Sequence, residues 1–318
     1  MSDALLDVTI SAREEQGSGV AVFELTSVSG EALPQYAAGA HIDVHVNQEL
    51  IRQYSLCTRP NDEGKYRIGI LNDPNSRGGS REIHADFEVG KQLSISSPRN
   101  HFPLETVATR TILAGGGIGI TPLIAMAYEL QARNQDFELH YCARTRGAGA
   151  FVEELQASFP ENVIFHYDDE EKSQLFSPAV ALGPCDEGTH IYVCGPSGFM
   201  DWVIAGAKEL GYPSAQVHFE YFSAEVDSSG ASFEVHCVKS DVTLVVEEQQ
   251  SIVKALAAAG VKVDVSCEEG VCGTCITDVL EGEPDHRDHF LTDEEKADND
   301  QMALCCSRAK SARLVIDI

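Results

Sequence analysis

The chain has 318 residues, which is too long for one comfortable hydrophobic core and suits two or three domains. Apolar residues make up 43% and charged residues 23%, so collagen-like, disordered and membrane-spanning classes are excluded. The net charge of −27 argues against binding to nucleic acid or to a membrane surface; it either attracts a positively charged protein partner or only aids solubility. Met1 to Ile10 has neither a basic start nor an apolar core, so we expect no signal peptide and predict a cytoplasmic monomer.

Residues 1–104 alternate polar and apolar residues in short runs separated by turn signals. This pattern predicts an antiparallel sheet or a small β-barrel. A short helix is expected after Gly79. The expected strands cover Asp7–Ser11, Val20–Leu25, His41–Val46, Tyr66–Leu71 and Gln92–Ser96.

Residues 105–222 change to strands that alternate with helices, which predicts a doubly wound α/β domain with a parallel sheet. We expect Thr121 to cap the first helix and Pro122 to be its first residue. Later helices are expected at Phe151–Phe159 and Ser197–Leu210. The expected strands cover Thr111–Ala114, Glu138–Cys142, Val163–Tyr167 and His190–Cys194.

Residues 223–232 (SAEVDSSGAS) have the composition of a flexible linker. A third domain, residues 233–318, follows. Here we expect strands near Ser232–Lys239 and Val242–Glu247, a helix over Ser251–Ala259, and then a loop rich in cysteine.

Four cysteines of this domain have the spacing C-x4-C-x2-C-x29-C, which is typical of a plant-type 2Fe–2S cluster. They are Cys267, Cys272, Cys275 and Cys305. Gly270 and Gly273 lie between the ligands and allow backbone N–H groups to approach the sulfurs. Structural zinc is the alternative, although zinc knuckles usually come in pairs. Cys306 could replace Cys305 as the fourth ligand.

The segment 281–300 holds nine acidic and two basic residues. Thr292 and Glu295 form a capping-box pattern, so a helix begins there. The acidic segment is either a solvated face or a docking surface for an electron acceptor.

Two segments have the features of phosphate sites. Ser76-Arg77-Gly78-Gly79-Ser80 leads into a helix, and a helix N-terminus offers bare N–H groups to a phosphate. The turn Gly115-Gly116-Gly117-Ile118-Gly119-Ile120-Thr121 joins a strand to a helix in the same way, although it is not a GxGxxG motif.

The whole chain resembles the phthalate dioxygenase reductase family, which includes the vanillate demethylase reductases. The resemblance rests on Arg52-Gln53-Tyr54-Ser55-Leu56, on the run Ser97 to Leu104, and on SCEEGVCGTC, HFLTDEE and CCSRA in the third domain. It implies an antiparallel β-barrel that binds FMN (1–104), an α/β domain that binds NADH (105–222), a linker (223–232) and a plant-type 2Fe–2S ferredoxin with an α+β, β-grasp fold (233–318).

The resemblance also implies the roles of individual residues. Tyr54 would pack on the isoalloxazine and Ser55 would lie near its N5, while the phosphate would meet Arg52, Gly78, Gly79 and Ser80. The nicotinamide dinucleotide would lie on Gly115, Gly117, Gly119 and Thr121, with Cys142 and Arg144 on its adenosine side and Cys194, Gly195 and Pro196 beside the nicotinamide. Phe222 would shield the flavin, so Ser55, Cys194 and Phe222 are the candidate catalytic residues, and Cys305 is favoured over Cys306 as the fourth ligand.

The order of these centres implies that a hydride passes from NADH to FMN and that single electrons then pass through the 2Fe–2S cluster to a Rieske-type terminal oxygenase. Asp168 could accept from ribose hydroxyls and repel a 2′-phosphate, which favours NADH, whereas Arg144 and Arg146 leave NADPH open. FMN follows from the resemblance alone, so FAD also stays open. The alternative function is a self-sufficient NADH-dependent flavin reductase that acts on a small acceptor such as a quinone.

Overall fold

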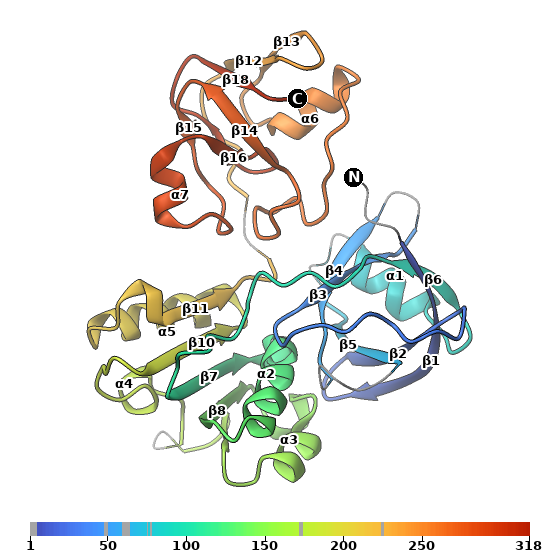
Figure 1. Ribbon diagram of the computed structural model, residues 1–318, viewed down its shortest axis with the longest axis vertical. Helices are drawn as coiled ribbons and strands as arrows, with labels where there is room; N and C mark the ends of the chain where they lie inside the picture. Colours follow the sequence, from blue (N-terminus) through green and yellow to red (C-terminus); the bar gives the residue numbers. More distant parts are fainter. Residues whose placement is uncertain are drawn as a thin grey trace. The chain divides into compact units, whose positions relative to one another are not determined.

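The computed structural model describes residues 5–47, 50–58, 64–74, 76, 78–171, 174–223 and 226–318. Arg77 of the expected phosphate turn, and Ala224 and Glu225 of the expected linker, lie outside the described residues. The chain divides into two compact units, Met1–Phe222 and Ser223–Ile318, which are described one after the other (Figure 1). The finer domain boundaries after residues 104 and 232 stay predictions.

In the described residues, the first unit opens with an antiparallel sheet in the order β4-β3-β6-β1-β2-β5. An isolated bridge from Leu56 to Ile68 joins its first and last strands, so the sheet closes into the predicted barrel. α1 (Gly79–Asp86) begins where a helix is expected. The strands are β1 (Leu6–Gln16), β2 (Val20–Ser27), β3 (His41–His45), β4 (Ile51–Ser55), β5 (Lys65–Leu71) and β6 (Gln92–Ile95).

The second sheet of this unit is parallel throughout, in the order β11-β10-β7-β8-β9. The strand order reverses between β7 and β10, and open α/β sheets bind ligands at the carboxyl ends of the strands beside such a reversal. The strands are β7 (Arg110–Gly116), β8 (Asp136–Ala143), β9 (Val163–Tyr167), β10 (Thr189–Cys194) and β11 (Val217–Glu220). The expected α/β class is therefore confirmed, and the sequence analysis missed β4 and β11.

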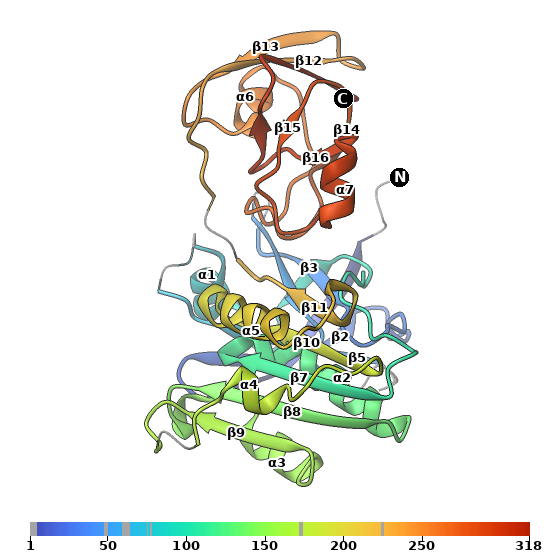
Figure 2. The same ribbon diagram turned by 90° about the vertical axis from the view of Figure 1, so that its left-hand side faces the viewer.

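Helices cover both faces of the parallel sheet (Figures 1 and 2). α2 packs on β7, β8 and β10, while α4 and α5 pack together, with α5 on β10 and β11. Three short 3-10 turns, η1 (Gly117–Gly119), η2 (Arg146–Ala148) and η3 (Ser214–Gln216), connect the elements. The helices are α2 (Ile120–Ala132), α3 (Val152–Ser158), α4 (Pro178–Ala181) and α5 (Ser197–Glu209). In the described part of the chain, we find no helix that is both long and apolar enough to cross a bilayer.

The prediction that Thr121 caps α2 is wrong. η1 runs directly into α2, so the helix begins at Ile120 and Gly119 occupies the N-cap position. The Thr121 hydroxyl donates instead to the carbonyl of Ile118, at 3.0 Å. Pro122 is the third helical residue, which is tolerated because an N–H in the first turn has no partner within the helix.

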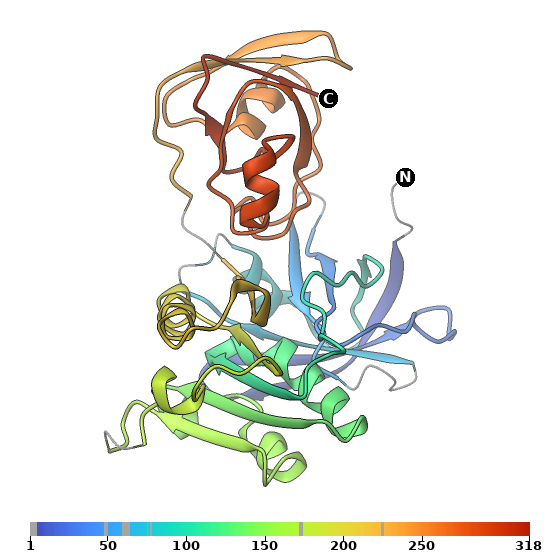
Figure 3. The same ribbon diagram turned by 60° about the vertical axis from the view of Figure 1, so that its left-hand side comes forward.

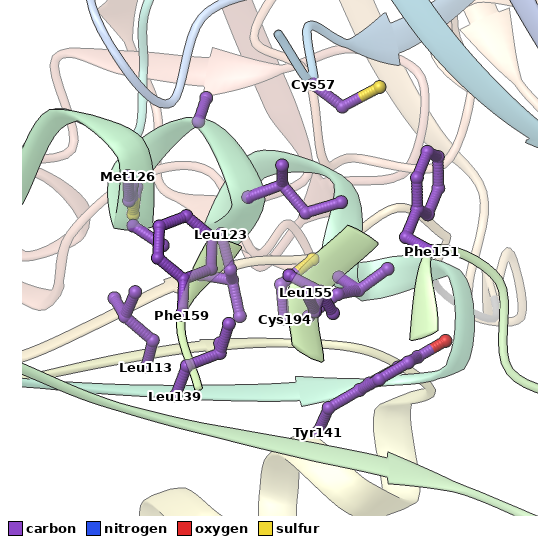
Figure 4. Packing of buried hydrophobic residues seen from close by; sticks show 14 of the residues in the cluster. Cys57, Leu113, Leu123, Met126, Leu139, Tyr141, Phe151, Leu155, Phe159 and Cys194 are labelled. Carbon is purple, nitrogen blue, oxygen red and sulfur yellow. The ribbon is translucent and has the colours of Figure 1, made fainter. Parts of the chain in front are cut away.

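One apolar core joins the barrel to the parallel sheet (Figure 4). Cys57 from the barrel, Leu123 from α2, Tyr141 from β8 and Phe151 before α3 all belong to it, and each is at most 2% exposed. At its edge the Arg67 guanidinium forms two hydrogen bonds with Glu154, of 2.6 and 2.8 Å. The two parts of this unit are therefore packed as one body.

The second unit combines a mixed sheet, in the order β13-β12-β18-β14-β16, with the helix α6 packed on it and with a small β15-β17 pair (Figure 3). Ser251 caps α6, and Thr292 and Glu295 form the expected capping box at α7. The predicted β-grasp class is confirmed. The elements are β12 (Phe233–Cys237), β13 (Val242–Val246), α6 (Ile252–Ala258), β14 (Ile276–Glu281), β15 (Pro284–Asp285), α7 (Asp293–Asp298), β16 (Gln301–Ala303), β17 (Arg308–Ala309) and β18 (Arg313–Ile316).

Part of the expected linker makes contacts with the second unit. From Asp227 to Ala231, the chain is held on the second unit by hydrogen bonds from Arg287 and Arg308. Composition could not reveal these bonds, because both arginines lie more than 50 residues further along the chain.

Candidate functional site

The four spaced cysteines come together in the second unit. Each is at most 9% exposed, and three of them lie on one loop between α6 and β14 while Cys305 follows β16. Hydrogen bonds from the thiols of Cys272 and then Cys305 lower the pKa of Cys267, and a hydrogen bond from Cys305 lowers that of Cys275. Four sulfurs from two segments therefore line one small volume.

The backbone of this loop requires its two glycines. Gly270 and Gly273 have φ angles of 74° and 73°, in the left-handed region that side chains disfavour. A Cβ on Gly270 would collide with Cys306 Sγ, and one on Gly273 would collide with the Phe290 ring. The loop also turns the Glu269 N–H toward Cys267 Sγ, at 3.3 Å. Four thiolates with N–H donors around them fit a 2Fe–2S cluster.

Cys306 lies beside the loop, and its thiol is also in contact with Cys305. Its thiol is 3.9 Å from both the Ala303 carbonyl and the Ser307 hydroxyl, next to Gly270. Within the described residues, no three His, Cys, Asp or Glu side chains are arranged to hold a single metal ion. A two-iron cluster makes a different demand, because each iron takes two cysteine sulfurs.

The flavin motif and the expected phosphate turn meet in the barrel. Gly79, the first residue of α1, lies so close to the Arg52 side chain that a Cβ would be 2.8 Å from Arg52 Cγ. Gly78 has φ 105° and open space around it, and no side chain caps the helix. The Ser80 hydroxyl is buried without a hydrogen-bond partner among the described residues. A basic side chain, bare N–H groups and an unsatisfied hydroxyl fit a phosphate.

The glycine turn after β7 meets the end of β10 at the reversal of strand order. A Cβ on Gly119 would collide with the carbonyl of Cys194, and one on Gly195 would lie 3.0 Å from Gly116 Cα. Gly117 has φ 55° and nothing within 4 Å of a Cβ position. Pro196 precedes the first residue of α5. These backbones approach closely at the carboxyl ends of β7 and β10, where open α/β sheets with this strand order bind dinucleotides.

The expected adenosine-side residues lie along the same edge of the sheet. Cys142 is near the end of β8, which pairs with β9, and the Asp168 N–H donates to the Ala143 carbonyl at 3.2 Å. Arg144 and Asp168 are exposed, so both side chains could reach a ligand. Burial, and secondarily the Asp168 charge, raise the pKa of Cys142, which keeps this thiol protonated.

The sequence analysis missed Glu220 and His41, which meet the expected site residue Ser55 where the two sheets of this unit come together. Glu220, at the end of β11, accepts a 3.3 Å hydrogen bond from the Ser55 hydroxyl, and its other oxygen lies 3.9 Å from His41 Nδ1. The Glu220 side chain is 15% exposed, and burial raises its pKa to about 7. Burial, helped by the charges of Arg99 and His101, lowers the pKa of His41 to about 4.

The candidate catalytic residues lie around this carboxyl group. Burial and then the nearby Glu220 charge raise the pKa of Cys194, whose side chain is wholly buried in the shared core (Figure 4). Phe222 is 37% exposed and lies two residues beyond Glu220. The only sequence signal for Glu220 was its place beside Phe222, because a single glutamate at a strand end is not distinctive.

Comparisons with known proteins match this arrangement. Residues 235–310 match the family of 2Fe-2S iron-sulfur cluster binding domains. The chain is 50% identical over 317 residues to the vanillate O-demethylase oxidoreductase of a Pseudomonas species, covering 99% of this chain and 100% of that protein.

Two solved structures have the same fold over 99% of this chain. Phthalate dioxygenase reductase, described as a modular structure for electron transfer from pyridine nucleotides to [2Fe-2S], has a TM-score of 0.76 at 37% identity, with 98% of its chain covered. An intact type IV self-sufficient cytochrome P450 monooxygenase has a TM-score of 0.88 at 35% identity, and the match covers 41% of that longer chain.

Proposed function

Because the chain belongs to the family of vanillate O-demethylase oxidoreductase and phthalate dioxygenase reductase, we propose that it is the NADH-dependent reductase component of a multicomponent Rieske-type oxygenase. The observation that carries the proposal is the group of four cysteine sulfurs, and it is supported by the unsatisfied Ser80 hydroxyl in the first turn of α1 and by the close approach of Gly119 to Cys194. We also propose that it acts as a monomer in the cytoplasm, where thiols such as the exposed Cys185 stay reduced.

When they are bound, FMN and the 2Fe–2S cluster supply the conversion of a hydride from NADH into single electrons. The protein binds and orients them. We assign the iron ligands to Cys267, Cys272, Cys275 and Cys305, and the FMN phosphate to Arg52, Gly78, Gly79 and Ser80. Tyr54 would pack on the flavin ring from β4, while Phe222 would cover the ring until nicotinamide replaces it.

Ser55 and Glu220 would hold the proton that the reaction leaves near the flavin. With a pKa of about 7, the Glu220 carboxyl can take up or release a proton at neutral pH, while the Ser55 hydroxyl donates a hydrogen bond to it. His41, whose Nδ1 lies 3.9 Å from the Glu220 carboxyl, stays neutral in this range and therefore places no fixed charge beside it.

The edge of the sheet at the carboxyl ends of β7 and β10 would orient the nucleotide. Gly115, Gly117, Gly119 and Thr121 lie on its β7 side, and Cys194, Gly195 and Pro196 on its β10 side. Asp168 and Arg144 at the ends of β9 and β8 would meet the adenosine, together with Cys142. The Asp168 carboxylate favours NADH because it can accept from ribose hydroxyls and repels a 2′-phosphate.

An anaerobic titration with NADH tests the proposal, using the unchanged chain and Cys272→Ser. We expect NADH to bleach flavin and iron–sulfur absorbance in the unchanged chain, and only flavin absorbance in the variant. A chain that holds flavin and cluster but reduces neither with NADH would refute the proposal. If quinone reduction proceeded at the same rate in both proteins while a Rieske-type oxygenase received no electrons, the self-sufficient flavin reductase would be correct instead.

A further inference from the structure

Five residues of the expected linker, Asp227 to Ala231, are fastened to the second unit; we name them the strap. Arg287 Nη1 donates to the carbonyls of Asp227 and Ser229, at 2.5 and 2.8 Å. Its Nε and Nη2 bind one oxygen of Asp285, at 2.8 and 2.6 Å, which fixes the guanidinium in place. Arg287 therefore holds the first half of the strap against the short β15-β17 pair.

Arg308 holds the second half. Its side chain is among the largest wholly buried ones in the protein, and a buried guanidinium needs acceptors for its N–H groups. Nη2 donates to the strap carbonyls of Gly230 and Ala231, at 3.4 and 3.0 Å. Two further acceptors, the carbonyls of Glu247 and Gln250, belong to the turn before α6. The strap thus supplies half of the carbonyls that satisfy this buried charge.

The strap also fits closely against Arg308. Gly230 has φ 144°, and a Cβ there would lie 3.0 Å from Arg308 Nε. The Ser228 hydroxyl adds a hydrogen bond to the Gln249 carbonyl, at 3.2 Å. Because side chains and backbone both take part, the strap is part of the second unit rather than part of a free linker.

We propose that Arg287 and Arg308 are positioning residues that shorten the tether between the two units and so speed electron transfer to the cluster; this rests on the proposed function. Only residues 223–226 separate Phe222 from the strap. An extended chain spans at most about 3.6 Å per residue, so Phe222 and Asp227 cannot be more than about 18 Å apart. With the strap released, the first fixed residue is Phe233 of β12, and the limit rises to about 40 Å.

The size of the effect follows from the tether length. The effective concentration of one tethered partner near the other falls roughly as the −3/2 power of the length of a flexible linker. Lengthening the tether from residues 223–226 to residues 223–232 therefore lowers it roughly fourfold. We expect electron transfer from flavin to cluster to slow by about this factor.

Two variants release the strap from opposite sides. Arg287→Gln removes the bonds to Asp227 and Ser229, and Gly230→Val pushes the strap off Arg308 without changing any residue of the sheet. Arg313→Gln is the matched control, because it removes an arginine of the same unit that does not bind the strap. Arg313 Nε lies 3.1 Å from Glu234 Oε1, and both side chains are exposed.

The first measurement is hydrogen–deuterium exchange of the strap in the protein with its flavin and cluster bound. We expect faster exchange over residues 226–232 in both variants and no change in the control. Equal exchange in all proteins would overturn the proposal, since the arginines would then not fasten the strap. Unchanged iron content and an unchanged cluster spectrum confirm that the second unit is still folded.

The second measurement is the rate of cluster reduction after rapid mixing with NADH. The expected result is roughly a fourfold slower rate when Arg287→Gln and Gly230→Val are combined, because each change alone leaves the other half of the strap fastened, and flavin bleaching should be as fast as in the unchanged chain. If cluster reduction kept its rate although exchange had increased, the strap would not set the rate. If NADH did not reduce the cluster of the unchanged chain at all, the proposed function itself would be wrong. Equal rates of cluster reduction in all proteins would instead refute only the role of the strap.

Discussion

Replacing Glu220 with glutamine removes a carboxyl group that is costly to ionise where it lies. Burial raises its pKa from 4.5 to about 7, against the opposing hydrogen bond from Ser55. Between these values the unfolded chain has already released the proton that the folded chain still holds. A rise in pH through this range therefore lowers the free energy of unfolding, and the loss stays constant above about pH 7, where Glu220 is ionised in both states.

The size of this cost follows from the shift. A difference of one pKa unit corresponds to about 1.4 kcal/mol, so ionised Glu220 destabilises the first unit by about 3 kcal/mol at pH 8. Glutamine can still accept from Ser55 but carries no charge. Raising the pH from 5 to 8 should therefore lower the stability of the unchanged chain by about 3 kcal/mol more than it lowers that of Glu220→Gln.

Chemical denaturation at several pH values measures this difference. The single tryptophan, Trp202, lies in α5 of the same unit, so its fluorescence reports the unfolding of that unit. Glu15→Gln is the control, because that carboxylate is 57% exposed. If Glu220→Gln changed stability by the same amount at pH 5 and pH 8, the buried carboxyl would not titrate as the structure implies.

Three further predictions follow from other parts of the chain. Gly273→Ala should lose most of its iron and keep its flavin, because a Cβ would strike the Phe290 ring; iron and flavin contents measured together check this, and full iron occupancy would contradict it. Burial, and then the neighbouring His166, lower the pKa of His140 to about 4. The unfolded chain therefore binds a proton that the folded chain does not, and the first unit should lose stability as the pH falls from 6.5 to about 4. Denaturant titrations should show a weaker pH dependence for His140→Asn. Turnover with the oxygenase partner should fall as salt rises from about 0.02 to about 0.2 M, since a protein of charge −27 attracts its partner electrostatically; a rate independent of salt would leave the acidic 281–300 segment as a solvated face.

Local patterns in the sequence were enough to predict the antiparallel and parallel sheets of the first unit and the group of cysteines, whereas the β-grasp class came from the family resemblance. The period of two in residues 1–104 and the change to alternating strands and helices both reflect which face of an element is buried. Three of the four cysteines share one loop, so their spacing alone brings them together.

Contacts between distant residues could not be read in the same way. Ser55 and Glu220 are 165 residues apart, and only the packing of the barrel on the parallel sheet brings them to hydrogen-bond distance. The strap has the composition of a flexible linker, and what holds it are two arginines that follow it by 58 to 78 residues. The start of α2 was misplaced because the turn Gly117–Gly119 is itself helical and moves the first residue back to Ile120.

The core shared by the barrel and the parallel sheet determines how this chain can be divided and recombined. Separating the barrel from the parallel sheet would expose Cys57 on one part and the apolar face of α2 on the other to water, so the two sheets have to be transplanted together. A cut between Phe222 and Asp227 falls at the boundary between the two compact units. Chimaeric reductases should therefore exchange the cluster-bearing unit from Asp227 onward. The carbonyls that accept hydrogen bonds from the buried Arg308 are then transferred together with it.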